Sequence, residues 1–145
     1  MQHVTDVILP SDLVGYKVRK LHNRLTKQWT HLSNKMGLQL SAVQAGILVF
    51  IDVKSGLTQK DLAELLRVDA STLSQALLPL LDRGLIRKYP DTEDRRKLQM
   101  ILSEDGKNLI DDISAVFSER QKNVPGNLSP KELRTLHALL DKMIT

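Results

Sequence analysis

The chain contains no cysteine among its 145 residues, which excludes disulfide bridges, cysteine-based zinc sites and thiol redox switches. Aromatic residues make up only 3 % of the chain, so we expect a core built from aliphatic side chains. No apolar run approaches the ~20 residues that a membrane-spanning helix needs, and the N-terminus lacks the basic-then-apolar pattern of a signal peptide. We therefore expect a cytoplasmic protein with no membrane partner.

Motifs of the common enzyme classes are also missing. There is no glycine-rich phosphate loop, no His–Glu metal motif and no order of residues that suits a catalytic triad. Asp111 and Asp112 are adjacent, so on a helix they point about 100° apart and are poorly placed for acid–base work. His22 and His31 lie about 900° apart along a helix, on opposite faces, which argues against a joint metal site. We expect no enzyme activity, no metal and no cofactor.

The centre of the chain has two short helical stretches joined by a tight turn, at 58–66 and 70–83. Thr58 and Asp69 are good N-caps for these helices, and Gly84 suits the left-handed position that ends the second one. Alternating strands follow at 85–89 and 98–102, around a loop at 90–97 that is too charged to be buried. This order predicts a helix-turn-helix with a wing, an arrangement that places one helix in a DNA groove.

Amphipathic helices are expected on both sides of this central part, at 11–36 and within 104–145, the first of them capped by Ser11 or Asp12. The formal charge is +4, and residues 1–56 alone carry 7 Lys/Arg against 3 Asp/Glu. Several of these cations lie on the face of the first helix opposite its apolar stripe. This basic face is either a solvated surface or a contact with the DNA backbone. The apolar stripes at both ends of the chain predict pairing with a second copy, because a two-fold dimer presents two reading helices to two half-sites.

The predicted architecture is mainly α with a small β-wing, in the order α-α-α-α-β-β-α-α. We expect a single domain over residues 1–145. Within it, 41–103 would form the winged DNA-binding part, while 11–36 and 104–145 would form the dimerisation helices. Residues 1–10 show no periodicity and are expected to form an arm.

Three segments carry a family resemblance: LTQKDLA at 57–63, STLSQ at 71–75 continuing to RGLI at 83–86, and DTEDRR at 91–96 followed by LSEDG at 102–106. Together they resemble the MarR family of bacterial winged-helix regulators over nearly the whole chain, and the last segment is the most specific. The resemblance implies an obligate homodimer, a palindromic double-stranded DNA operator, and a repressor that is often released by a small ligand.

The resemblance also implies which residues contact DNA. Asp94 and Arg96 match the wing pair, in which the carboxylate orients a guanidinium that enters the minor groove. Hydroxyl groups at the exposed start of the second helix suit phosphates or base edges. The complete expected set is Thr58, Ser71, Thr72, Ser74, Gln75, Asp94, Arg95, Arg96 and Lys97.

Gln75 departs from the family pattern, since many relatives carry arginine there. Arginine pairs best with guanine and glutamine with adenine, so we expect an A·T pair where relatives read guanine. A ligand pocket between the helical and winged parts is also implied, and by position alone four residues are expected to line it: Tyr16, His22, Trp29 and His31. An alternative function is a winged-helix module that binds proteins and no DNA, but the intact cations Arg95, Arg96 and Lys97 favour the DNA reading.

Overall fold

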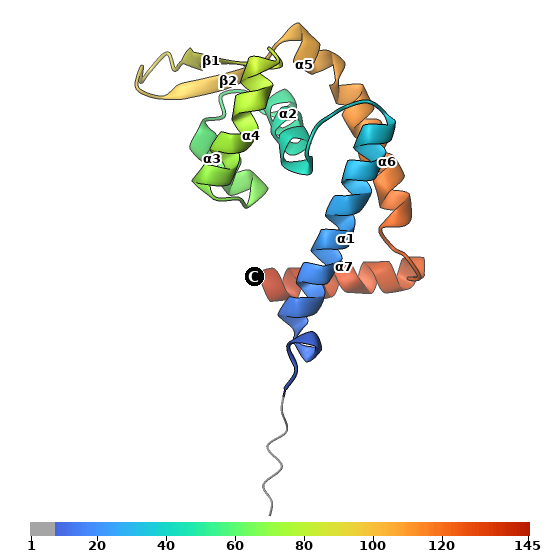
Figure 1. Cartoon of the computed structure of the whole chain (residues 1–145). Coiled ribbons are helices and arrows are strands. Elements are labelled where there is room, and N and C mark those ends of the chain that lie inside the picture. Colours follow the sequence, from blue (N-terminus) through green and yellow to red (C-terminus); the bar gives the residue numbers. More distant parts are fainter. Residues whose placement is uncertain (1–7) are drawn as a thin grey trace, which may run out of the picture.

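The computed structural model describes residues 8–145. It has a compact winged part, from which long helices of the N-terminal and C-terminal segments extend (Figure 1). The first seven residues of the expected arm lie outside the described residues. The elements follow in the order η1 (Pro10–Asp12), α1 (Val14–Lys35), α2 (Ala42–Val53), α3 (Gln59–Leu66), α4 (Ala70–Asp82), β1 (Ile86–Pro90), β2 (Leu98–Leu102), α5 (Glu104–Asn108), α6 (Ile110–Asn123) and α7 (Pro130–Ile144).

Helix α2 is the centre of the winged part and packs against α1, α3, α4, α6 and β2. A capping box starts it, in which Ser41 Oγ accepts from the Gln44 N–H at 3.1 Å and the Gln44 side chain accepts from the Ser41 N–H at 2.9 Å. Because this helix is apolar on most of its surface, it is stable only where neighbouring elements cover it. Four of its residues are buried: Ala45, Ile47, Leu48 and Ile51.

Helices α3 and α4 form the predicted helix-turn-helix. Arg67 adopts the left-handed conformation in the turn, at φ 56°, and Asp69 caps α4 by accepting from the Thr72 N–H at 2.6 Å. At the far end of α4, the Arg83 guanidinium donates to the carbonyls of Leu38 and Gln39. These contacts tie the end of α4 to the loop between α1 and α2, so the direction of α4 is fixed at both ends.

The wing is an antiparallel hairpin in which Ile86 pairs with Leu102 and Pro90 with Leu98. The second strand has the predicted bounds, whereas the first begins one residue later than predicted and extends to Pro90. The segment before Thr58 also pairs with the wing. Leu57 accepts a hydrogen bond from the Met100 N–H at 3.1 Å, which anchors the hairpin to the start of α3.

The predicted order has two helices after the wing, but the structure has three, because α5 and α6 are separate helices that meet at Leu109. Ser103 caps α5 by accepting from the Gly106 N–H at 3.1 Å. Gly106 lies so close to the Leu85 carbonyl that a Cβ on this residue would overlap the oxygen. The position of the first turn of α5 is therefore fixed by its contact with Leu85, the residue directly before β1.

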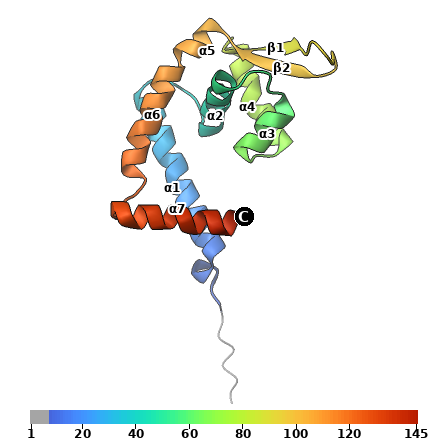
Figure 2. The same ribbon diagram turned by 180° about the vertical axis from the view of Figure 1, so that it is seen from behind.

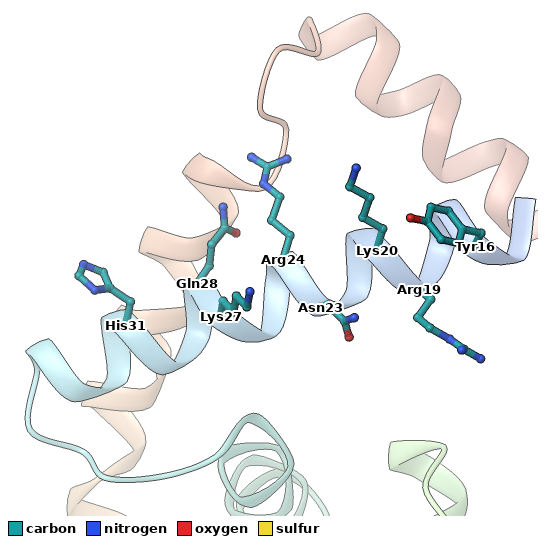
Figure 3. A pocket seen from close by; sticks show the side chains of 8 residues that line it. All are labelled: Tyr16, Arg19, Lys20, Asn23, Arg24, Lys27, Gln28 and His31. Atoms are coloured by element: carbon teal, nitrogen blue, oxygen red, sulfur yellow. The ribbon is translucent and has the colours of Figure 1, made fainter. Parts of the chain in front are cut away.

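Helix α1 packs along α6, away from the wing, and α7 crosses α1 at its far end (Figure 2). No residue of α7 is buried. Figure 3 shows Lys20 and Arg24 on the side of α1 that faces α7. The expected cap at Ser11 or Asp12 is wrong, because the N-cap of α1 is Leu13, which has no side-chain acceptor.

Within residues 8–145, no helix is both long and apolar enough to cross a membrane.

Candidate nucleic-acid interface

Helix α4 turns a polar face outward at its start. Leu73, Leu77 and Leu80 are buried in the core, at 0 to 2 % exposure, and they fix the rotation of the helix about its axis. The polar residues of the first two turns lie on the remaining surface. Four of the sequence-predicted DNA contacts are exposed there: Ser71, Thr72, Ser74 and Gln75.

Two features of α4 hold its start in place. The Asp69 carboxylate accepts from backbone N–H groups at the helix N-terminus, chiefly that of Thr72, which lowers the pKa of Asp69. The Gln59 amide, from the first residue of α3, donates to Ser74 Oγ at 2.6 Å. Sequence reasoning missed this second contact, because the two residues lie on different helices and no local pattern links them. Ser74 is therefore a partnered hydroxyl held at the edge of the exposed face.

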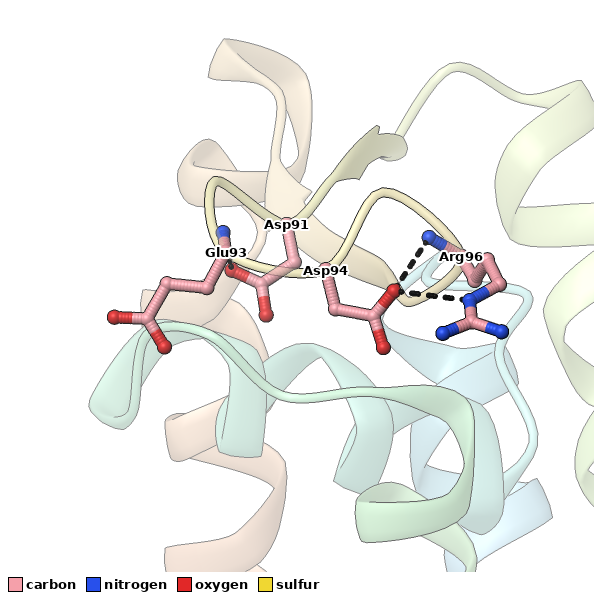
Figure 4. A network of polar contacts seen from close by, with 4 residues as sticks. All are labelled: Asp91, Glu93, Asp94 and Arg96. Atoms are coloured by element: carbon pink, nitrogen blue, oxygen red, sulfur yellow. Dashed lines mark hydrogen bonds and ion pairs between the residues drawn. The ribbon is translucent and has the colours of Figure 1, made fainter.

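The wing loop contains the expected pair of Asp94 and Arg96 (Figure 4). Asp94 Oδ1 accepts from the Arg96 backbone N–H at 3.0 Å and from Nε at 3.4 Å. The Arg96 side chain is 93 % exposed and that of Asp94 39 %, so the ion pair adds little to stability. Its effect is to orient the guanidinium at the tip of the hairpin. Arg95 and Lys97 form no ion pair within residues 8–145 and also face solvent.

Thr58 lies between the wing and α3, where its hydroxyl caps the helix by accepting from the Asp61 N–H at 3.2 Å. In return, Asp61 accepts from the Thr58 N–H at 2.9 Å. These hydrogen bonds lower the pKa of Asp61, and the charges of Lys54 and Lys97 lower it further. The half-buried Thr58 therefore has a structural role as a helix cap. Arg96 and Lys97 line the same surface hollow as Thr58, but their side chains are exposed to solvent.

A separate groove of about 750 Å³ runs along α1. It contains two of the four residues expected to line a ligand pocket, Tyr16 and His31, and the expectation is wrong for Trp29. That side chain is fully buried, donates from its indole N–H to the Leu40 carbonyl at 2.9 Å and packs on Phe117 with ring centroids 5.1 Å apart. His22 is exposed but does not line the groove.

The lining of this groove is basic. The prediction of the ligand pocket, which rested on position alone, did not consider this charge. No acidic side chain lines it, and among the described residues none of its cations forms an ion pair. All of its lining residues belong to α1 (Figure 3). Four cationic residues contribute to it: Arg19, Lys20, Arg24 and Lys27.

Helices α3 and α4 packed on α2, the two-stranded hairpin and the exposed face of α4 define a winged helix-turn-helix protein. Residues 40–98 match the model of the MarR family. This match covers the winged part of the chain and identifies it as similar to the MarR family of transcriptional regulators.

Several curated relatives match at 27 % identity. The HTH-type transcriptional regulator BilQ of Clostridium symbiosum aligns over 75 % of this chain and 78 % of its own length. The multiple antibiotic resistance protein MarR of Salmonella typhimurium aligns over 94 % of this chain and 92 % of its own. Both alignments are longer than the winged part, and the one to MarR, at 94 % of the chain, extends into the terminal helices.

Solved structures agree on the fold. A probable transcriptional regulator from Pseudomonas aeruginosa superimposes with a TM-score of 0.81 at 28 % identity, over 92 % of this chain and 98 % of that one. The MepR–DNA complex of S. aureus gives a TM-score of 0.81 at 25 % identity, over 91 % and 96 %. Bordetella bronchiseptica BpsR, which 6-hydroxynicotinic acid regulates, reaches 0.86 at 23 % identity, over 94 % and 96 %, a likeness of fold alone.

Proposed function

We propose that this protein is a sequence-specific double-stranded DNA-binding regulator that represses transcription. The observation that carries the proposal is the placement of the exposed, hydroxyl-rich start of α4 beside an arginine-tipped wing. The match to the MarR family and the DNA-bound MepR relative support it. In this function α4 enters the major groove, where base edges can be read.

The wing supplies the electrostatic part of binding. Arg96, oriented by Asp94, reaches the minor groove, where narrow A·T-rich sequence concentrates negative potential. Arg95 and Lys97 contact phosphates, because they are exposed and have no internal partner among the described residues. Thr58 caps the start of α3 beside the wing, and the N-terminus of this helix faces the phosphate backbone of the DNA.

A homodimer completes this function. Exposed apolar side chains gather at the start of α1 and along α7, where Met143 is 66 % and Ile144 77 % exposed. A second copy related by a two-fold axis would cover both surfaces and place two α4 helices on a palindromic site. Removing the residues before Leu25 should abolish the dimer. A truncated protein that stays folded, monomeric and competent to bind DNA would contradict this part of the proposal.

Release by a small ligand is assigned to the basic groove along α1. Its unpaired cations suit an anionic effector, and Tyr16 offers an aromatic face at one end. We test this with 6-hydroxynicotinic acid, the compound that regulates BpsR. The acid should raise the melting temperature of the wild type but not that of Arg24→Ala. Equal shifts in both proteins would place any effector elsewhere.

The remaining assignments follow from this function. The protein forms one domain over residues 1–145 and acts in the cytoplasm without catalytic activity. Residues 41–103 bind DNA, while 11–36 and 104–145 dimerise. The alternative, a winged module that binds only proteins, predicts no affinity for any duplex.

Selection from a random pool of duplexes at low ionic strength separates the two functions. A palindromic consensus, with affinity that falls steeply as salt rises, is expected because phosphate contacts release counterions. Failure to retain any duplex would overturn the proposed function in favour of the alternative.

A further inference from the structure

Helix α4 contains no charged residue from Ala70 to Leu81. The side chains that it offers to a DNA groove are therefore hydroxyls, one amide and whatever apolar groups remain outside the core. One such apolar group stands out. Leu78 is 60 % exposed, whereas three other leucines of the same helix, Leu73, Leu77 and Leu80, are at most 2 % exposed.

Leu78 belongs to the outward face of α4. It follows Gln75 by three residues and Ser71 by seven, and these spacings place all three side chains on one side of a helix. The buried leucines at 73, 77 and 80 define the opposite side. The outward face therefore reads Ser71, Gln75 and Leu78 in succession, and the Gln75 side chain makes no hydrogen bond within residues 8–145.

This exposed leucine is distant from the surfaces where a second copy is expected. The exposed apolar side chains at the start of α1 and along α7 lie at the end of the molecule away from α4 (Figures 1 and 2). A single exposed leucine is common on protein surfaces. Here, however, it shares a face with the amide that has both a donor and an acceptor to offer to a base.

The major groove has one apolar feature, the 5-methyl group of thymine, and aliphatic side chains pack against it. We propose that Leu78 is a base-reading residue that contacts a thymine methyl beside the A·T pair read by Gln75. Three residues of helix advance about 4.5 Å, and one base step about 3.4 Å, so the two reading contacts fall one or two base pairs apart. The inference rests on the proposed DNA-binding function and assigns to it a second specificity residue.

The test removes single methyl groups from the DNA. In the operator obtained by selection, each thymine is replaced in turn by deoxyuridine, which lacks only the methyl, and affinity is measured by fluorescence anisotropy. At one symmetric position, the wild type should lose about fourfold in affinity, the value expected for one buried methyl group. Leu78→Ala should bind the thymine and uracil forms of that site equally.

Two controls keep the outcomes apart. Leu65→Ala removes another half-exposed leucine, on α3 and outside the reading face, and should keep the wild-type response to uracil. Replacing adenines by 7-deazaadenine should locate the Gln75 contact one or two base pairs from the sensitive thymine. If the protein selects an operator but Leu78→Ala keeps the full uracil response at every position, this inference is overturned and the proposed function stands. If no duplex is bound at all, the proposed function fails first.

Discussion

The amide of Gln59 donates a hydrogen bond to the hydroxyl of Ser74 at 2.6 Å, which links the first residue of α3 to the exposed face of α4. Ser74 Oγ uses one lone pair for this bond, so its own proton remains free to donate outward. A hydroxyl held in this way is an oriented donor toward a phosphate or a base acceptor, rather than a freely rotating group.

This relationship predicts coupling between the two side chains in operator binding. Gln59→Ala and Ser74→Ala should each weaken binding several-fold, and the double variant should be little worse than either single variant. Fluorescence anisotropy at fixed salt measures all four proteins. Ser71→Ala provides the matched control, because the Gln59 amide donates to Ser74 and forms no hydrogen bond with Ser71 among the described residues, so its effect should add to that of Gln59→Ala. Full additivity for Ser74 would show that the bond does not orient the hydroxyl for DNA.

The wing pair predicts a loss of affinity without a loss of stability. Arg96→Ala should weaken operator binding at least tenfold, or ~1.4 kcal/mol, and should reduce the salt dependence of binding. Asp94→Ala should have a smaller effect, since it keeps the cation but frees its orientation. Lys122→Ala, which removes an exposed cation paired with Glu119 on α6, is the control and should leave binding unchanged. Unimpaired binding by Arg96→Ala would mean that the wing is idle.

The close approach at the start of α5 predicts a strongly destabilised variant. Gly106→Ala places a Cβ against the Leu85 carbonyl oxygen, so either the wing or α5 must shift. The expected cost is about 1–3 kcal/mol, measured as a lower urea midpoint. Gly15→Ala is the matched control, because nothing lies within 4 Å of its added carbon, and its stability should change by less than about 0.5 kcal/mol.

The capping box of α3 predicts an acid-sensitive contribution to stability. Hydrogen bonds from Thr58 lower the pKa of Asp61 in the folded protein, so protonation is harder there than in the unfolded chain. The contribution is therefore present above the ordinary carboxylate range and is lost as pH falls through the lower, folded pKa. Asp61→Asn should lower the urea midpoint at pH 7 and converge with the wild type in strong acid. A gap that is the same at both pH values would contradict this origin.

Much of the fold was predictable because its signals are local. The predicted cap at Thr58 lies within four consecutive residues, and the structure has capping boxes of the same local kind at Ser41 and Ser129. The pair of Asp94 and Arg96 is also local, two residues apart in a short loop. Predictions of this kind need no knowledge of how the elements pack.

Where sequence reasoning erred, the deciding contacts join distant parts of the chain. Trp29 was expected near a ligand, but it lies in the core because the loop after α1 brings the Leu40 carbonyl to its indole N–H. The predicted order has two helices after the wing, but the structure has three, and the first of them is held at its start by the Ser103 N–H, which donates to the Leu85 carbonyl. Neither contact has a signature in the spacing of neighbouring residues.

The sequence by itself determined the helix-turn-helix and the wing, the caps at Thr58 and Asp69, and the pairing of Asp94 with Arg96 in the wing loop. Short-range hydrogen bonds and hydrophobic periodicity set these features, and both are written in consecutive residues. Only the tertiary structure decided that Gln59 holds Ser74, that Trp29 is enclosed and that Leu78 stays outside the core. These outcomes depend on how the elements cross and rotate against one another, which is settled by packing across the whole domain.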